Sequence, residues 1–398
     1  MSGQTHEPVI LSAVRTPIGS FQGTLAPLSA PQLGAVAVRA AVERAGVPPE
    51  RVEEVLLGHV VPAGTGQASA RQAALGAGLP PEVPATGINK VCGSGLKAVM
   101  LAAGMIKAGD ARVLVAGGQE SMSNVPYALK TARNGFRLGH QEVTDLMIHD
   151  GLWCGFNGCH MGNLAEYTAA KSGLSREQLD TFAFESHQKA LKAQAEGRFE
   201  AELVGVPVPQ RKGDPVSMTA DETPRADTTL EVLAKLRPAF DKAGMITAGN
   251  SPGLNDGASA LVVTSRAAAE ELGAAPLARI VAYAQAAVTP KELFYAPVHA
   301  VRRLLSLMGV KIDHFDLIEA NEAFAAQALA DGKELGWDWG RVNVHGGAIA
   351  LGHPIGASGA RVLTTLIHAL RTRGGHTGLA TLCLGGGGAV ALAVERED

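Results

Sequence analysis

Strand-like and helix-like segments alternate along this 398-residue chain. In the first 121 residues, apolar segments such as "PVILSAVR" and "DARVLVAGGQE" are typical of buried strands, and the alanine-rich segments between them have helical periodicity. One helix is predicted to begin after Ser29, a candidate N-cap, with Pro31 in its first turn, and to end at Gly46. The alternation predicts an α/β fold whose sheet contains parallel strands and has helices on both faces.

The same alternation returns in the last third of the chain. "LARIVAYAQA" is a predicted strand, "FDLIEANEAFAAQALA" a strand, turn and helix, and "TGLATLCLGGGGAVALAV" a hairpin-like pair of strands. "NVHGGAIALGHPIGASGARVLTTLIHALRTRG" is predicted to be a strand, a glycine-rich turn and a long helix. His59 and Cys92 are 33 positions apart, and Asn321 and His353 are 32 positions apart. We therefore expect two related halves.

Residues 121–249 break this pattern. They contain charged helical segments such as "SREQLDTFAFESHQKALKAQAEG", followed by a long polar stretch. A segment of this kind is typical of an insertion that serves as a cap or a binding subdomain. The predicted organisation is a first half of residues 1–120 and 250–272, an inserted loop domain of residues 121–249, and a second half of residues 273–398.

Charge and cysteine content exclude several protein classes. The net charge of −3 gives no reason to expect a nucleic acid or an anionic membrane as a partner. Four cysteines in so long a chain do not form a disulfide framework. The stretch "MSGQTHEPVI" lacks the features of a secretory signal, "VERED" is not a peroxisomal address, and the longest apolar run is interrupted by four glycines. We expect a cytoplasmic enzyme with reduced thiols and no membrane partner.

Two glycine-rich segments carry candidate catalytic side chains. Cys92 stands where a strand gives way to Gly-Ser-Gly and a helix, so free backbone N–H groups and the helix dipole are expected to favour its thiolate, the nucleophilic form. The alternative is a buried, inert cysteine. His353 lies in "GGAIALGHPIGASG", a segment that offers a core histidine few packed neighbours, and could take a proton from a thiol. The alternative is a structural histidine in a turn.

Two further candidates follow predicted strands. Cys383 ends an apolar strand just before Gly385–Gly388, where unpaired backbone amides could form an oxyanion hole. Asn321 in "EANEAF" stands at a strand-to-helix exit and could orient a water or a carbonyl. It could equally be a plain N-cap.

The segment "WCGFNGCHMG" raises the question of a metal site. Cys154, Cys159 and His160 are close in sequence, but no second Cys/His pair stands at a spacing expected for zinc. No metal is therefore predicted. The segment "GGAIALGHPIGASG" also lacks the endings of a P-loop and of a dinucleotide-binding fingerprint, so no nucleotide cofactor is predicted.

Six motifs together resemble the thiolase family, in that family's order and over essentially the whole chain. They are "NKVCGSGLKAV", "GGQESMS", "GLNDGASALVV", "EANEAFAAQ", "GGAIALGHPIGASGAR" and "CLGGGGAVA". The resemblance implies the duplicated, five-layered αβαβα thiolase fold with an inserted loop domain. It also implies a homodimer or homotetramer that acts on acyl-CoA and CoA, with coenzyme A thioesters as substrates and no permanently bound cofactor.

The resemblance also implies roles for the residues already named. Cys92 would accept an acyl group from acyl-CoA with His353 as its base, and Cys383 would remove the α-proton of a second acetyl-CoA. One oxyanion hole would comprise His353 and a water held by Asn321. The other would comprise the backbone N–H groups of Cys92 and Gly385.

Other residues match the family's substrate-contacting positions. "IHDGLWCGFNGCHMG" resembles the short-chain, biosynthetic branch, which implies that His160 and Met161 lie over the acyl site and that Phe324 lines the same pocket. Arg225 matches a position near the CoA adenine. Phe240 matches one along the pantetheine tunnel.

The chain departs from the family pattern at three places. Pro252 replaces a serine that contacts CoA, "LFYAP" puts Phe294 and Tyr295 near the acyl end, and Ala389 stands where glycine is usual. The favoured function is acetyl-CoA C-acetyltransferase. The alternatives are a broader-chain 3-ketoacyl-CoA thiolase, a decarboxylating ketoacyl synthase and a non-catalytic acyl-CoA-binding subunit. The second cysteine, Cys383, argues against the synthase, which generates its carbanion by losing CO₂.

Overall fold

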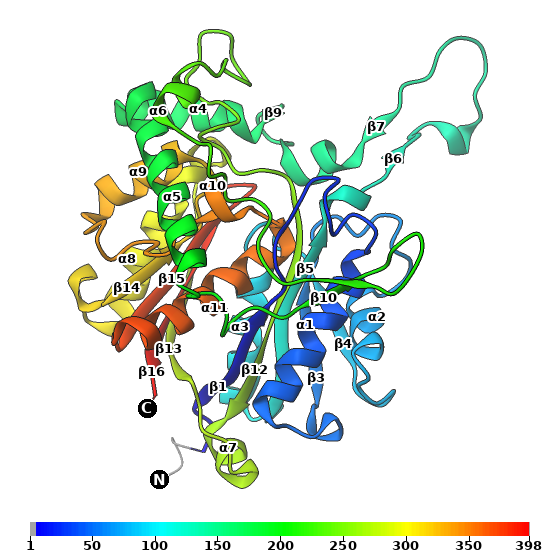
Figure 1. Cartoon of the computed structure of the whole chain (residues 1–398), viewed down its shortest axis with the longest axis vertical. Helices are drawn as coiled ribbons and strands as arrows, with labels where there is room; N and C mark the ends of the chain where they lie inside the picture. The colour runs from blue at the N-terminus through cyan, green and yellow to red at the C-terminus, as the bar shows by residue number, and fades with distance from the viewer. Residues whose placement is uncertain (1–4, 398) are drawn as a thin grey trace.

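Figure 1 shows the protein as a computed structural model, which describes residues 5–397. The first four residues of "MSGQTHEPVI" and the last residue of "VERED" lie outside the described residues. Two sheets stand side by side, and the N- and C-terminal ends of the described chain lie near each other at the bottom of the view.

The first sheet is mixed, with the strand order β4-β3-β5-β12-β1. Strand β3 pairs in parallel with β4 and β5, whereas β12 is antiparallel to both β5 and β1. The strands are β1 (Pro8–Arg15), β3 (Glu54–Gly58), β4 (Ala85–Ile88), β5 (Val113–Ser121) and β12 (Asn255–Ser265), with the short β2 (Gly19–Ser20) paired to β12.

The second sheet repeats this order as β14-β15-β16-β13, with β14 and β15 parallel and the other pairs antiparallel. The strands are β13 (Ala278–Ala287), β14 (Leu317–Ala320), β15 (Thr377–Leu384) and β16 (Gly388–Arg396). Each strand has its counterpart in the first sheet, so the predicted duplication is confirmed. The two sheets are continuous at one edge, where β1 pairs with β13 over two residues.

One predicted strand is wrong. The segment beginning "NVHGG" forms no strand, and Val342, just before it, makes only an isolated bridge with Ile318. Asn343 has a positive φ of 45°, and its side chain bonds both backbone groups of Ala320, at 2.9 and 2.8 Å. The side chain therefore takes the place of the next backbone pair and the chain turns away from the sheet.

Helices make the remaining layers. Helices α1 (Ala30–Ala45) and α2 (Ser69–Gly76) cover the outer side of the first sheet, and α8 (Ala296–Met308) covers that of the second. Between the sheets lie α3 (Ser94–Ala108) and α11 (Ile355–Arg373), which pack on each other. This gives the five-layered αβαβα arrangement. Ser29 and Gly46 cap α1 as predicted.

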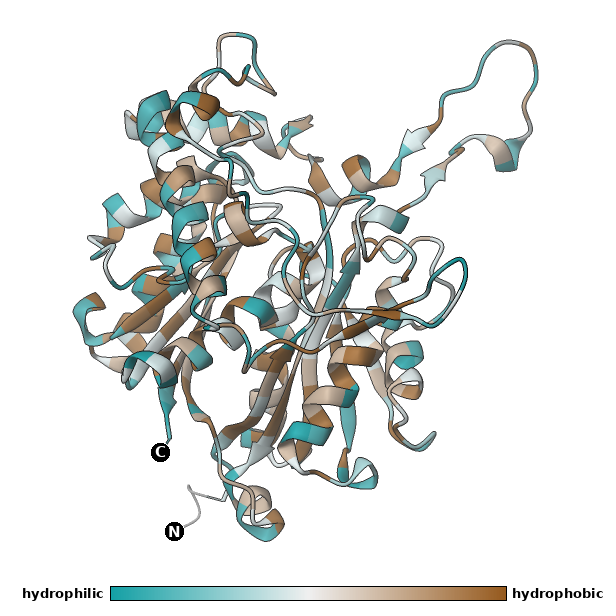
Figure 2. Ribbon diagram, in the orientation of Figure 1, coloured by the Kyte–Doolittle hydropathy of each residue, from teal (hydrophilic) through white to brown (hydrophobic). Residues whose placement is uncertain are grey.

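The central layer is the main core. Leu96, Ile106, Leu363 and Leu366 from α3 and α11 are completely buried among apolar residues of both sheets, and each stabilises the fold by roughly 2 kcal/mol. By length and composition alone, residues 91–108 could span a membrane. They include helix α3, however, which lies in this core. Figure 2 shows the apolar residues concentrated on the strands and on the helix sides that face them.

Between β5 and β12 the chain leaves the sheets. A long arm carrying β6 (Tyr127–Ala128) and β7 (Thr144–Asp145) extends away from the body, and the hairpin of β8 (Trp153–Cys154) and β9 (Cys159–His160) follows it. Helices α4 (Met161–Ser172), α5 (Arg176–Ala195) and α6 (Leu230–Ala234) then pack beside α9 (Ala325–Leu335) and α10 (Ala348–Leu351). Strands β10 (Val206–Val208), β11 (Val216–Met218) and helix α7 (Arg266–Leu272) complete the chain.

Candidate active site

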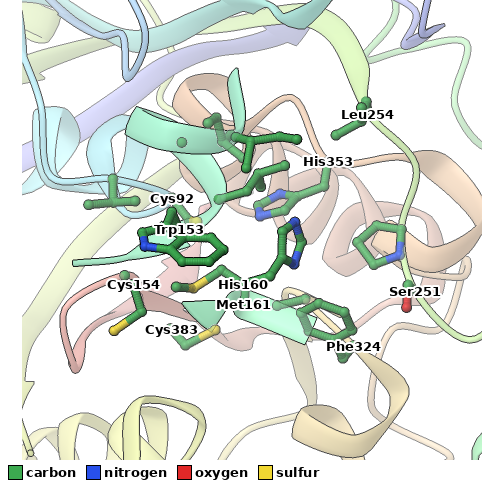
Figure 3. Close-up of a pocket in the computed structure, with 18 of the residues that line it drawn as sticks. Cys92, Trp153, Cys154, His160, Met161, Ser251, Leu254, Phe324, His353 and Cys383 are labelled. Atoms are coloured by element: carbon green, nitrogen blue, oxygen red, sulfur yellow. The ribbon is translucent and has the colours of Figure 1, made fainter. Parts of the chain in front are cut away.

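A cavity of about 580 Å³ lies where the strand ends meet the segment between β5 and β12. Figure 3 shows Cys92, His353 and Cys383 converging on it from three distant parts of the chain. Ten residues were expected to have a catalytic or substrate-contacting role, and nine of them line this cavity: Cys92, His353, Cys383, Gly385, His160, Met161, Arg225, Phe240 and Phe324. Asn321 does not line it.

Cys92 stands at a sharp turn between β4 and α3. Val91, just before it, has a φ of 47°, which is a strained conformation for a β-branched residue. The hydroxyl of Ser94 holds this turn, because it accepts from the N–H of Lys90 at 2.8 Å and donates to the carbonyl of Val91 at 2.6 Å. The strain thus lies directly before the residue that presents its thiol to the cavity.

The thiolate predicted for Cys92 is wrong for the unliganded protein. Burial raises the pKa of Cys92 to about 11, although the N–H groups of Gly385 and of Cys92 itself donate to the sulfur and act in the opposite direction. The nearby carboxylate of Glu120 raises the pKa further. Desolvation therefore outweighs the helix terminus and the backbone donors, and Cys92 is a neutral thiol at pH 7.

His353 is buried, contrary to the expectation that its glycine-rich segment lacks packed neighbours. Its backbone N–H donates to Asn255 Oδ1 at 2.8 Å, and its Nδ1 lies 2.6 Å from Ser358 Oγ. Because the Ser358 hydroxyl donates to the Pro354 carbonyl, its oxygen accepts from Nδ1–H and leaves Nε2 as the acceptor. Burial, with a smaller effect of Arg361, lowers the pKa of His353 to about 3, so the ring is neutral.

Cys383 is also buried, at the end of β15. Burial raises the pKa of its thiol well above the usual value, and the nearby Cys92 raises it further. The turn that follows requires glycine at Gly386 and Gly387, where φ is 84° and 92°. The turn brings the N–H of Gly385 against the sulfur of Cys92. Ala389, the third departure, is buried in β16 opposite Cys383.

Asn321 is completely buried behind the cavity. The N-cap of α9 is Phe324, so the N-cap interpretation of Asn321 is wrong. Its Nδ2 and Oδ1 have no hydrogen-bond partner among the described residues. A buried amide is costly without a partner.

Aromatic rings pack together in the part of the cavity wall where the acyl group is expected. Phe324 is in edge contact with Phe294, at a centroid distance of 5.4 Å, and with Phe240, at 6.2 Å. His160 stacks on Phe240 at 4.7 Å. Tyr295 was also expected here, but that expectation is wrong. Its hydroxyl lies 2.6 Å from Ser172 Oγ, outside the residues that line the cavity, because the short helix of Pro290–Tyr295 points consecutive side chains in different directions.

The groups that hold this site in place are not evident from the sequence. Glu120 is completely buried and accepts from the N–H groups of Val60, Val61 and Gly356, and His59 Nε2 lies 3.3 Å away. This carboxylate links the strand ends of the first sheet to the start of α11, next to His353. The motif "GGQESMS" contains Glu120, but nothing in the sequence indicates its backbone partners.

Cys154, Cys159 and His160 all lie in the β8–β9 hairpin. Among residues 5–397, no group of three or more His, Cys, Asp or Glu side chains is arranged to hold a metal ion. His160 instead caps α4, since its Nδ1 accepts from the N–H of Gly162 at 3.1 Å.

Comparisons with known proteins agree with this geometry. A family profile described as "Thiolase, N-terminal domain" matches residues 8–267, and one described as "Thiolase, C-terminal domain" matches residues 274–396. Acetyl-CoA acetyltransferases of Pseudomonas aeruginosa and Cupriavidus necator are each 57% identical over 98% of this chain, and over 100% and 99% of their own lengths. The crystal structure of the Bacillus anthracis acetyl-CoA acetyltransferase is 44% identical, with a TM-score of 0.97 over 99% of this chain and 100% of that one. The chain therefore belongs to the thiolase family.

Proposed function

We propose that this chain is an acetyl-CoA C-acetyltransferase, which condenses two acetyl-CoA molecules to acetoacetyl-CoA and CoA and catalyses the reverse thiolysis. The observation that carries the proposal is the meeting of two buried thiols and a neutral histidine in one apolar cavity. In the first half-reaction, Cys92 attacks the thioester carbonyl and His353 Nε2 accepts the thiol proton. CoA leaves with that proton, and Cys92 carries the acetyl group.

In the second half-reaction, Cys383 passes its thiol proton to His353 Nε2 and, as a thiolate, removes the α-proton of a second acetyl-CoA. The carbanion attacks acetyl-Cys92, and the released Cys92 thiolate takes the proton from His353. Two sites stabilise the oxygen charges. The N–H groups of Gly385 and Cys92, which already point at the sulfur, serve the acyl-enzyme oxygen. His353, while its Nε2 carries a proton, and a water held by the unpaired amide of Asn321 serve the enolate oxygen.

We propose that coenzyme A enters the cavity between two parts of the chain. One is the set of strand ends of the two sheets, and the other is the loop domain, residues 121–249. Arg225 lies on the cavity wall, where it suits the adenine end of CoA, and Phe240 and Pro252 line the path of the pantetheine. His160 and Met161 lie over the acyl end. CoA thioesters are substrates in this scheme, and no permanently bound cofactor takes part.

The acyl end favours a short chain. Phe294, part of the departure "LFYAP", is 2% exposed and packs on Phe324. Bulk at this position fills the space that a longer acyl chain would need. A broader 3-ketoacyl-CoA thiolase, the second candidate, would require this pair of rings to separate.

The test is incubation with labelled acetyl-CoA, followed by mass analysis of the protein and product. Label on Cys92 and formation of acetoacetyl-CoA are expected, and Cys92→Ser should lose both, because a hydroxyl is far less ionised than a thiol. A non-catalytic acyl-CoA-binding subunit would bind acetyl-CoA without either product. A decarboxylating synthase would need malonyl rather than acetyl thioester as the donor of the carbanion.

We further propose a homodimer or homotetramer in the cytoplasm. Strand β4 is an unpaired edge of the first sheet, and its Thr86 and Gly87 are exposed. The arm of β6 and β7 carries exposed apolar side chains, including Leu138 at 98% exposure and Tyr127 at 67%. Such a patch on an extended arm is typical of a contact between copies. All four cysteines are free thiols, which suits a reducing compartment.

A further inference from the structure

The β8–β9 hairpin places two free cysteines directly opposite each other. Cys154 in β8 and Cys159 in β9 are register partners in an antiparallel pair, and four residues join them. The proposed reaction uses neither thiol. Side chains of directly opposed residues lie on the same side of a ribbon, with Cβ atoms about 4.5–5.5 Å apart. Cα atoms of opposed residues are about 4.5–5.5 Å apart, within the range that a disulfide spans.

Both cysteines contact the same apolar cluster. Cys154 is 2% exposed and belongs to a cluster that includes Cys383, and Cys159 packs against that cluster while remaining half-buried. Cys154 also lines the cavity, whereas Cys159 does not. The amide of Asn157 donates to Cys154 Sγ at 3.1 Å, which places this sulfur on the side of the connecting loop. One thiol is therefore accessible from solvent and the other forms part of the cavity wall.

We propose that Cys154 and Cys159 form a reversible disulfide, a redox modification site in the wall of the cavity. The co-reactant is a low-molecular-weight disulfide such as glutathione disulfide. The thiolate of Cys159 attacks one of its sulfurs and releases one glutathione thiolate. Cys154 then attacks the mixed disulfide at Cys159 and releases the second. Two cysteine thiols are oxidised, one glutathione disulfide is reduced to two thiols, and the two protons lost by the cysteines go to them.

The disulfide would change the cavity through the neighbouring residues. Trp153 and His160 are the next register pair, and both line the cavity. The β8–β9 hairpin contains only two residue pairs, and its Trp153 and Phe156 are 44% and 76% exposed. Few contacts therefore stabilise the pairing of the two strands. A covalent link beside the Trp153–His160 pair fixes how far these rings separate. It therefore restricts the adjustment of the wall when an acyl-CoA enters.

Mass spectrometry tests the disulfide directly. Trypsin cleavage after Arg137 and Lys171 releases residues 138–171, which contain Cys154 and Cys159 but neither of the other cysteines. After exposure of the full-length protein to glutathione disulfide at pH 8.5, and blocking of free thiols with N-ethylmaleimide under denaturing conditions, we expect this peptide unlabelled and two hydrogens lighter. The alkaline pH is chosen because burial raises the pKa of Cys159. A disulfide between Cys92 and Cys383 would instead join two other peptides.

Cys159→Ser is the matched control, since it keeps Cys154 and both proposed catalytic thiols. In this variant Cys154 should remain a thiol and take up one maleimide. In the wild type, kcat/KM for acetoacetyl-CoA thiolysis should fall by about threefold on oxidation and return with dithiothreitol. The same oxidation should leave kcat/KM of Cys159→Ser unchanged. Two maleimides on the wild-type peptide, or a stable glutathione adduct on Cys159 beside a free Cys154, would overturn the proposal. So would an equal loss of activity in both proteins. The mass readout does not depend on the proposed activity.

Discussion

Replacing Phe294 with alanine tests the idea that this ring limits acyl-chain length. Phe294 is buried against Phe324 at the acyl end, and its removal opens space that faces the cavity. A 3-ketohexanoyl-CoA carries two methylenes more than acetoacetyl-CoA, and each buried methylene contributes about 0.8 kcal/mol. The variant should therefore favour the six-carbon substrate by about 1.6 kcal/mol more than the wild type does, which is roughly 15-fold in kcat/KM.

The assay is thiolysis by CoA of 3-ketoacyl-CoA substrates with four and six carbons, for wild type and variant under the same conditions. Phe294→Ala should also lower the free energy of unfolding by about 3–5 kcal/mol, so circular dichroism must first show that it is folded. Tyr295→Phe is the control, because its hydroxyl contacts Ser172 outside the cavity and its loss should leave the ratio unchanged. A folded Phe294→Ala that retains four-carbon activity with an unchanged ratio would refute the reasoning.

Three further predictions concern the thiols and the buried histidines. The rate at which iodoacetamide alkylates Cys92 should rise about tenfold per pH unit from pH 7 to 10, since the pKa is about 11; a plateau below pH 8 would contradict this. In Cys383→Ser, mass spectrometry should still detect acetyl-Cys92, while condensation falls by roughly 10²–10⁴-fold; equal loss of both steps would remove Cys383 as a separate base. Burial lowers the pKa of His187 and of His345 from 6.5 to about 4, so the unfolded chain binds these protons first. Stability should thus fall by about 3 kcal/mol per histidine as the pH drops from 6.5 to 4, and urea unfolding of His345→Gln should have a shallower pH dependence; an unchanged slope would contradict the assignment.

The arrangement of the chain was predictable because its signals are local. Apolar periodicity and the capping residues of α1 define the elements, and the two nearly equal spacings, from His59 to Cys92 and from Asn321 to His353, indicate the duplication. Glycine-rich turns after strands mark the places where thiols and backbone amides can meet. These features indicated Cys92, His353 and Cys383, which line one cavity. The roles of the other candidates on the cavity wall were implied only by the resemblance to the thiolase family.

The remaining features depend on contacts between distant segments. Asn343 replaces a backbone pair with its side chain and ends a strand that periodicity alone predicts. Tyr295 follows Phe294 directly, yet the turn of the short helix sends it to another surface. Glu120 collects N–H donors from two loops that are far apart in sequence. None of these outcomes is encoded in a single short window of residues.

The largest difference between the sequence-based expectation and the structure concerns the charge state of Cys92 and His353. It affects the mechanism directly. Burial raises the pKa of Cys92 and lowers that of His353, so moving the proton from thiol to imidazole in the unliganded protein is unfavourable. A resting thiolate–imidazolium pair is therefore not the reactive state. The proton must move as the sulfur bonds to the thioester carbon, when the negative charge passes to an oxygen within reach of the Gly385 and Cys92 N–H groups. The same burial that makes the thiols unreactive toward water-borne reagents thus makes their activation depend on a bound substrate.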